Sequence, residues 1–192
     1  MLQVGSTVFA HGGVTPPHVA YGVDRINSEA RQWMRGEAGE EMPQFYRGRD
    51  SVVWTRDYSN NNKSRCDCEK LETALAGMQA KRMVVGHTIQ TEGINDACGG
   101  RVFRVDVGLS RGCGDGEPEV LEIIDDTVVR VLRKGAEPIV LSDGVCEIKK
   151  KEEDDCCKPA AGKAGGNGAR ASRRAHQQQR FQHASGGGGR FL

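Results

Sequence analysis

Residues 8–13, Val-Phe-Ala-His-Gly-Gly, and residues 84–88, Val-Val-Gly-His-Thr, share one arrangement: an apolar run delivers a histidine into a glycine-containing turn. Each run predicts a strand, and each glycine predicts a tight turn after it. In α/β folds, the loops beyond strand ends converge and carry ligand-binding residues. Because neutral imidazole is a common metal ligand, we expect His11 and His87 to hold one metal ion together. Alternatively, each is an ordinary loop histidine whose ring is satisfied by backbone hydrogen bonds.

The remaining patterns predict a mixed α/β fold. Apolar residues at three- and four-residue steps predict helices, and continuous or alternating apolar runs predict strands. The early strands enclose helices, whereas the late strands pair with one another through Asp125-Asp126. The predicted helices span 18–34, 37–46 and 69–81, and the predicted extended segments are 3–10, 52–54, a strand beginning at 83, 101–107, 120–124, 127–132 and 138–141.

The chain of 192 residues joins two different compositions. Residues 158–192 contain seven Lys or Arg, no Asp or Glu and eight Gly, so the formal net charge of +1 hides an acidic body and a basic tail. A segment with so few apolar residues cannot build a core. We therefore expect a folded domain over residues 1–148 and a disordered, charged and Gly/Arg/Gln-rich tail over residues 149–192.

The composition also suggests a cellular setting. No stretch approaches the roughly 18 apolar residues of a membrane span, and no basic and apolar leader follows Met1. Seven cysteines at irregular spacing favour reduced thiols over a disulfide framework, and Cys66 and Cys68 lack the spacing of a zinc site. The expectation is a cytoplasmic protein without a membrane partner.

The order of the motifs resembles a known family. With residues 53–58, Val-Trp-Thr-Arg-Asp-Tyr, the two histidine turns resemble the second half of a calcineurin-like metallophosphoesterase, in particular the Shewanella-like branch of the phosphoprotein phosphatases. The resemblance covers approximately residues 3–133. Further supporting motifs are Gly-Val-Asp-Arg-Ile-Asn at 22–27, Ala-Lys-Arg-Met at 80–83, Ile-Asn at 94–95, Ala-Cys-Gly-Gly at 97–100 and Val-Asp-Val-Gly at 105–108.

This resemblance implies a fold and a chemistry. The fold would be α/β, the C-terminal half of a calcineurin-like metallophosphatase β-sandwich flanked by helices. The activity would be hydrolysis of a phosphomonoester in a phosphoprotein or phosphopeptide, on Ser, Thr or Tyr, by water that two divalent ions (Mn, Fe or Zn) activate. His11 and His87 would be ligands of the same ion, and Arg56 would contact the substrate phosphate. Alternatively, Arg56 is a surface arginine stacked on Trp54 or Tyr58.

One departure from the family is large. The other metal ligands of the family lie earlier, in Gly-Asp-x-His-Gly, Gly-Asp-x-x-Asp-Arg-Gly and Gly-Asn-His-Glu types of motif, and none of these occurs here. The chain therefore supplies ligands to only one ion. Two hypotheses follow. In the first, the chain is the C-terminal part of a metal-dependent phosphoprotein phosphatase. In the second, it is a catalytically inactive fragment or pseudophosphatase that acts as a binding module. Nucleic acid is an expected partner only through the basic tail, for which a solvated extension is the alternative.

Overall fold

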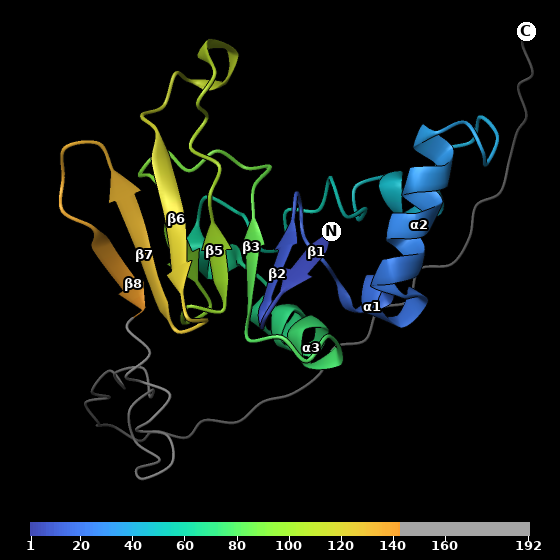
Figure 1. Ribbon diagram of the computed structural model, residues 1–192, viewed down its shortest axis with the longest axis horizontal. Coiled ribbons are helices and arrows are strands. Elements are labelled where there is room, and N and C mark those ends of the chain that lie inside the picture. Colours follow the sequence, from blue (N-terminus) through green and yellow to red (C-terminus); the bar gives the residue numbers. More distant parts are fainter. Residues whose placement is uncertain (143–192) are drawn as a thin grey trace, which may run out of the picture. The chain divides into compact units, whose positions relative to one another are not determined.

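A computed structural model describes residues 1–142 (Figure 1). The expected domain boundary at residue 148 and the expected tail over 149–192 lie outside these described residues. No helix within residues 1–142 has the length and apolar content that a bilayer crossing requires.

Residues 1–142 form two sheets, and the larger has five strands in the order β1-β2-β3-β5-β4. Strands β2, β3 and β5 run parallel to one another, and the outer strands β1 and β4 run antiparallel to their neighbours. The sheet consists of β1 (Leu2–Val4), β2 (Thr7–Ala10), β3 (Arg82–Val85), β4 (Asn95–Ala97) and β5 (Val102–Arg104).

The smaller sheet is an antiparallel meander of β6 (Glu119–Ile124), β7 (Val128–Arg133) and β8 (Ile139–Ser142). The predicted hairpin is confirmed, and Asp125 and Asp126 both adopt the positive φ that its turn requires. Aspartate tolerates this conformation better than most residues with side chains. The mixed α/β class that the patterns predict is therefore confirmed.

In the described part of the chain three α-helices accompany the sheets, α1 (Pro16–Tyr21), α2 (Val23–Met34) and α3 (Cys68–Gly77). The single helix predicted over 18–34 is wrong, because Gly22 adopts a φ of 106° and closes α1 before α2 begins. Short 3₁₀ turns lie at Gln44–Tyr46, Lys63–Arg65 and Arg111–Cys113.

The β2–β3 pair separates two apolar cores because neighbouring strand residues point to opposite faces. On one face, Val8 and Val85 pack with Leu71 and Leu75 of α3. On the other face, Val84 packs with residues of both sheets. Figure 1 shows the resulting arrangement, with α3 on one side of the five-stranded sheet and the meander on the other.

Two other predicted segments differ from the structure. Residues 37–46 do not form a helix, since Gly36 and Gly39 adopt left-handed backbone conformations and only the final residues make a 3₁₀ turn. Residues 52–54 form a turn instead of an extended segment. The carbonyl of Val52 accepts hydrogen bonds from the backbone amides of Gly12 and Gly13, at 2.9 and 3.2 Å, rather than from a strand.

Cys68 and Cys98 form a disulfide, which differs from the expectation of reduced thiols. The bond joins the first residue of α3 to the turn between β4 and β5, across 30 residues of sequence. Their spacing in the sequence gave no sign of this contact, because it depends on the packing of α3 beside the sheet. Cys66 and Cys113 are free.

The N-terminus of α1 depends on a neutral imidazole. His18 is 1% exposed, and its Nδ1 accepts a hydrogen bond from the backbone amide of Thr15 at 3.0 Å. The ring also lies perpendicular to that of Phe45, with centroids 5.1 Å apart. Burial lowers the pKa of His18, so the folded chain keeps the ring neutral at pH values where the unfolded chain protonates it.

We expect Leu75→Ala to lower the free energy of unfolding by about 2–5 kcal/mol, because Leu75 is fully buried and its loss leaves a cavity under α3. Urea unfolding followed by circular dichroism measures the change. The matched control is Leu109→Ala, since Leu109 is 60% exposed and its loss is expected to change stability by less than about 0.5 kcal/mol. Equal losses for the two variants would contradict the assignment of the core.

We also expect acid to destabilise the chain through His18. Its folded pKa is lower than its unfolded value of about 6.5, so the stability it contributes is present above that pH and is lost as pH falls. His18→Gln keeps an acceptor but cannot titrate, so the decline of the urea midpoint between pH 7.5 and pH 5 should be shallower in this variant. An unchanged slope would show that His18 is not the titrating group.

Candidate functional site

His11 and His87 meet because β2 and β3 are adjacent parallel strands in a fixed register. Ala10 pairs with Val85, so the residues that follow leave the same edge of the sheet. The backbone amide of Gly86 then donates to the carbonyl of His11 at 2.9 Å. The Nε2 of His11 lies 3.1 Å from the Nδ1 of His87.

The two imidazoles have a spacing that suits a shared cation. Two nitrogens that each bind one ion at about 2.1 Å, with an angle between 90° and the tetrahedral value, lie roughly 3.0–3.4 Å apart. The observed 3.1 Å falls within this interval. A hydrogen bond between the two rings satisfies the same distance without an ion, and it needs at least one ring to be neutral. The pair therefore fits part of a metal site.

Further ligands for such an ion are not found within residues 1–142. In this part of the chain no three His, Cys, Asp or Glu side chains form a group that could hold a metal ion. Catalytic sites use about three protein ligands for each metal. The residues that the structure describes thus fit two ligands of one ion, and they do not fit the second ion of a dinuclear centre.

His87 is held in an unusual environment. Its backbone φ is 68°, which is uncommon for a residue with a side chain, and its ring is nearly perpendicular to that of Trp54, with centroids 5.2 Å apart. Burial, the positive charge of Arg56 and the neighbouring His11 lower the pKa of His87. The ring is therefore kept neutral, which is the form that offers a lone pair to a cation.

The glycines after His11 allow a close approach of the segment 52–58. A Cβ on Gly12 would lie 2.9 Å from the carbonyl oxygen of Thr55, and a Cβ on Gly13 would lie 2.8 Å from the ring of Tyr58. The backbone amides of Gly12 and Gly13 donate hydrogen bonds to the Val52 carbonyl at this same contact. The His-Gly-Gly sequence thus brings the segment that carries Arg56 directly against the segment that carries His11.

Arg56 lines a hollow of about 500 Å³ together with Trp54, whose ring also contacts that of His87. The other lining residues are Gly48, Arg49, Asp50 and Asp57. The alternative position for Arg56, stacked on Trp54 or Tyr58, is not found in the described part of the chain, where the only cation–π contact is that of Arg25 with Tyr21. Its guanidinium is exposed and close enough to lower the pKa of His87.

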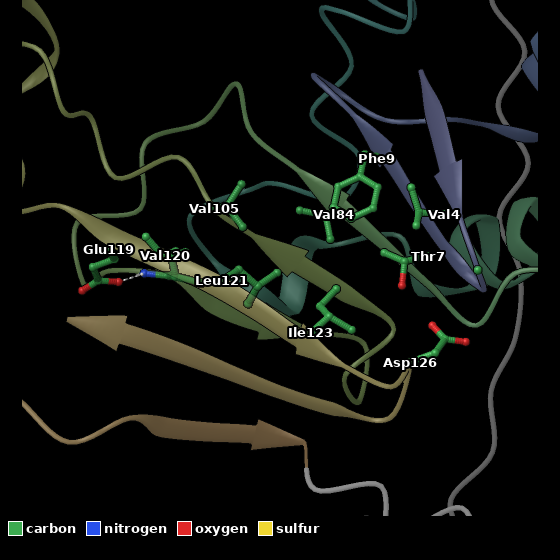
Figure 2. Close-up of a pocket in the computed structure, with 12 residues that line it drawn as sticks. Val4, Thr7, Phe9, Val84, Val105, Glu119, Val120, Leu121, Ile123 and Asp126 are labelled. Atoms are coloured by element: carbon green, nitrogen blue, oxygen red, sulfur yellow. Dashed lines mark hydrogen bonds between the residues drawn. The ribbon is translucent and has the colours of Figure 1, made fainter.

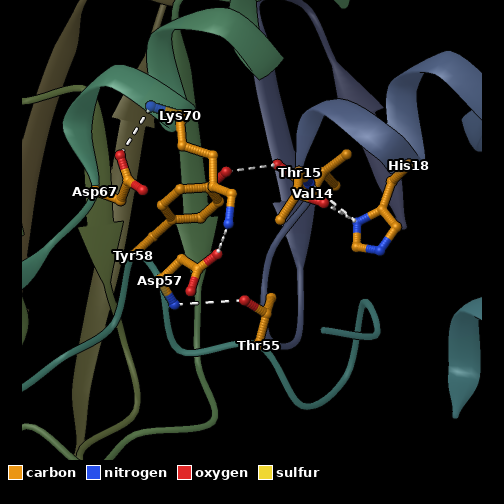
Figure 3. A network of polar contacts seen from close by, with 8 residues as sticks. All are labelled: Val14, Thr15, His18, Thr55, Asp57, Tyr58, Asp67 and Lys70. Atoms are coloured by element: carbon orange, nitrogen blue, oxygen red, sulfur yellow. Dashed lines mark hydrogen bonds and ion pairs between the residues drawn. The ribbon is translucent and has the colours of Figure 1, made fainter. Parts of the chain in front are cut away.

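A polar network fixes the residues on either side of Arg56 (Figure 3). The Nζ of Lys70 pairs with the carboxylate of Asp57 at 2.6 Å, and the hydroxyl of Tyr58 donates to the carbonyl of Val14 at 3.2 Å. The backbone amide of Asp57 donates to the hydroxyl of Thr55 at 3.4 Å. Arg56 therefore lies between residues that are attached both to α3 and to the loop after β2.

A second set of contacts ties the Arg56 segment to the His87 loop. The hydroxyls of Ser59 and Thr88 are 2.8 Å apart. The buried side chain of Gln90 donates from its Nε2 to the carbonyls of Ser59 and Thr88, at 3.0 and 2.8 Å. Because these groups are fully or largely removed from water, their hydrogen bonds hold the two loops in one relative position.

The sequence did not identify Trp54 or Asp106 as residues of the candidate site. Trp54 is 54% exposed beside the imidazole pair, and its place in the motif of residues 53–58 is the only signal that could have identified it. Asp106 caps the following turn, since its carboxylate accepts from the amide of Gly108 at 3.0 Å. Its negative charge also opposes the lowering of the His87 pKa.

No family model matches the chain. Similar proteins include two Shewanella-like protein phosphatases. Shewanella-like protein phosphatase 2 of Arabidopsis thaliana is 49% identical over 131 residues, which cover 67% of this chain and 34% of that protein. Shewanella-like protein phosphatase 1 of Plasmodium berghei is 29% identical over 140 residues, which cover 69% of this chain and 39% of that protein. The chain thus spans between a third and two fifths of the length of these relatives.

The fold has a counterpart among solved structures. A cold-active protein-tyrosine phosphatase of a psychrophilic Shewanella species superimposes with a TM-score of 0.58 and 18% sequence identity, over 72% of this chain and 41% of that one. At this identity the likeness concerns the fold alone. The resemblance predicted from the motifs is confirmed by these sequence matches: over about two thirds of its length, the chain is similar to the Shewanella-like protein phosphatases.

Proposed function

We propose that this chain forms the C-terminal part of a metal-dependent phosphoprotein phosphatase. The observation that carries the proposal is the 3.1 Å separation of the His11 and His87 nitrogens at the ends of adjacent parallel strands, with Arg56 close enough to lower the pKa of His87. The names of the similar proteins support the reaction class. In the proposed site, the two imidazoles hold one divalent ion (Mn, Fe or Zn), and the other ligands come from outside residues 1–142.

The residues of the candidate site have separate roles in the proposed reaction. A bound divalent ion would activate water and neutralise negative charge on the phosphoryl group. Arg56 binds two phosphate oxygens through its planar guanidinium and stabilises the charge that grows as the phosphorus–oxygen bond breaks. Asp57 and Tyr58 do not touch the substrate in this proposal, and they position Arg56 through their contacts with Lys70 and Val14.

The second candidate is a catalytically inactive fragment or pseudophosphatase that binds partners. It is favoured by the lack of a third metal ligand within residues 1–142. Both candidate functions predict that purified residues 1–192 alone do not raise the rate of hydrolysis of an aryl phosphate or a phosphopeptide above that in Mn²⁺-containing buffer. They differ in whether the two histidines and Arg56 function once the other family motifs are supplied.

A chimera separates the two candidates. The matched segment of this chain replaces the corresponding segment of the Arabidopsis relative, and Mn²⁺-dependent hydrolysis of phosphoserine, phosphothreonine and phosphotyrosine peptides is measured. We expect activity within about tenfold of the relative, because the segment supplies two ligands of one ion and the phosphate contact. In the chimera, His87→Gln and Arg56→Lys should each lower kcat/KM by about a hundredfold or more. This is the usual effect of removing one group that stabilises the transition state.

Arg25→Lys is the matched control for Arg56→Lys. Arg25 is an exposed arginine on α2 that pairs with Glu29, so its replacement should leave kcat/KM unchanged. A folded chimera without activity, or a chimera that keeps full activity after His87→Gln, would overturn the proposed function.

A further inference from the structure

Two arginines share the open hollow of the candidate site. Arg49 and Arg56 both line the hollow of about 500 Å³ that Trp54 borders. The apolar groove between the two sheets (Figure 2) differs from it, because valine, leucine, isoleucine and phenylalanine side chains make up most of the groove lining. The hollow at Arg56 therefore offers positive charge where the groove offers an apolar surface.

A series of turns fixes the backbone between the two arginines. The carbonyl of Gly48 accepts a hydrogen bond from the amide of Ser51 at 3.3 Å, and the carbonyl of Ser51 accepts from the amide of Thr55 at 3.0 Å. Ser51 and Thr55 are each 1% exposed, which anchors these turns in the protein. Arg49 and Arg56 lie on either side of this anchor and are exposed.

Neither guanidinium has a partner within residues 1–142. The side chains of Arg49 and Arg56 form no ion pair, hydrogen bond or cation–π contact with any residue of this part of the chain. By contrast, Arg47 pairs with Glu41 at 2.7 Å. A planar guanidinium binds carboxylates and phosphates through paired N–H donors. The hollow thus holds two cationic groups that are available to an anion.

The acidic residues of the hollow do not cancel this charge. The carboxylate of Asp57 is already paired with the ammonium group of Lys70 at 2.6 Å (Figure 3). Asp50 is the other carboxylate of the lining, and its charge acts on Lys70 as well. Asp67, a third carboxylate near Lys70, caps α3 and does not line the hollow. One positive charge therefore remains in excess at the lining.

Trp54 connects the hollow to the histidine pair. Its ring lines the hollow and also contacts the ring of His87, with centroids 5.2 Å apart. A phosphate held by Arg56 would therefore have the hollow directly beside it. Adjacent residues of a bound peptide are only about 3.8 Å apart between Cα atoms, so the residue next to the phosphorylated one reaches the hollow.

We propose that this hollow binds a second anionic group of the substrate, a carboxylate or a phosphate on a residue next to the phosphorylated one, and that Arg49 recognises it. The proposal rests on the proposed function, which assigns the phosphate to be hydrolysed to Arg56. The hollow of about 500 Å³ is within the range of roughly 300–1,000 Å³ that ligand sites occupy. The preferred substrate is thus a phosphopeptide with acidic neighbours.

Binding of three phosphopeptides to the full chain of 192 residues tests the proposal without relying on catalysis. The peptides share one phosphoserine and differ only in its neighbours, which are glutamate, a second phosphoserine or alanine. Calorimetry at low ionic strength measures the affinities, because salt screens exposed charges. We expect the glutamate peptide, the doubly phosphorylated peptide or both to bind about fivefold or more tightly than the alanine peptide. The one that binds more tightly identifies the anion that the hollow prefers.

Arg49→Gln should remove this preference, so that all three peptides bind within about twofold of one another. Arg47→Gln is the matched control, because Arg47 is an exposed arginine two residues away that does not line the hollow. This second variant should keep the preference of the original chain. Both substituted side chains are exposed, and circular dichroism of the two variants should match that of the original chain.

Three outcomes overturn the proposal: equal binding of the three peptides, no measurable binding of any of them, and a preference that Arg49→Gln leaves intact. The proposed function fails separately. A chimera that hydrolyses all three peptides with the same KM contradicts the role of Arg49 and leaves catalysis intact. Binding of acidic peptides through Arg49, together with a chimera that hydrolyses none of them, contradicts catalysis alone.

Discussion

The parallel pairing of β2 with β3 is the constraint on which the candidate site depends. Because Ala10 lies opposite Val85, the two chains leave the sheet at one level, and the hydrogen bond from Gly86 to the carbonyl of His11 extends the pairing by one step. A shift of a single residue would turn one of the two histidines toward the opposite face. The register is held by apolar residues on both faces, so the core and the site are determined by the same contacts.

The sequence predicted the parts of the fold that depend on local pattern. The hairpin through Asp125-Asp126 and the α3 helix carry their signals within a few residues. The single extended segment predicted over 3–10 is two strands, β1 and β2, separated at Gly5, and β4 was missed because it has three residues and is stabilised by its neighbour rather than by its own pattern. Residues 52–54 were predicted as extended because of their β-branched side chains, yet the backbone of Val52 serves the glycines after His11.

The candidate site shows the same division. The strand-and-glycine pattern predicted that His11 and His87 lie at strand ends, and the family motifs indicated Arg56. No pattern could predict that Gln90 and Ser59 tie the Arg56 segment to the His87 loop, since these hydrogen bonds join residues about 30 positions apart. Contacts of this kind arise only once the sheet has brought the two loops together. The Cys68–Cys98 disulfide is another example, because it follows from the position of α3 beside the sheet.

The absence of space beside Gly12 and Gly13 has a consequence for how the chain can change through evolution. A side chain at either position would collide with the backbone of Thr55 or the ring of Tyr58, and Arg56 lies between them. The atoms that face Gly12 belong to the backbone, so no substitution in the 52–58 segment makes room for a side chain there, whereas a smaller residue in place of Tyr58 would relieve the contact at Gly13. Gly12 should therefore be exchanged rarely in evolution, and Gly13 only together with Tyr58.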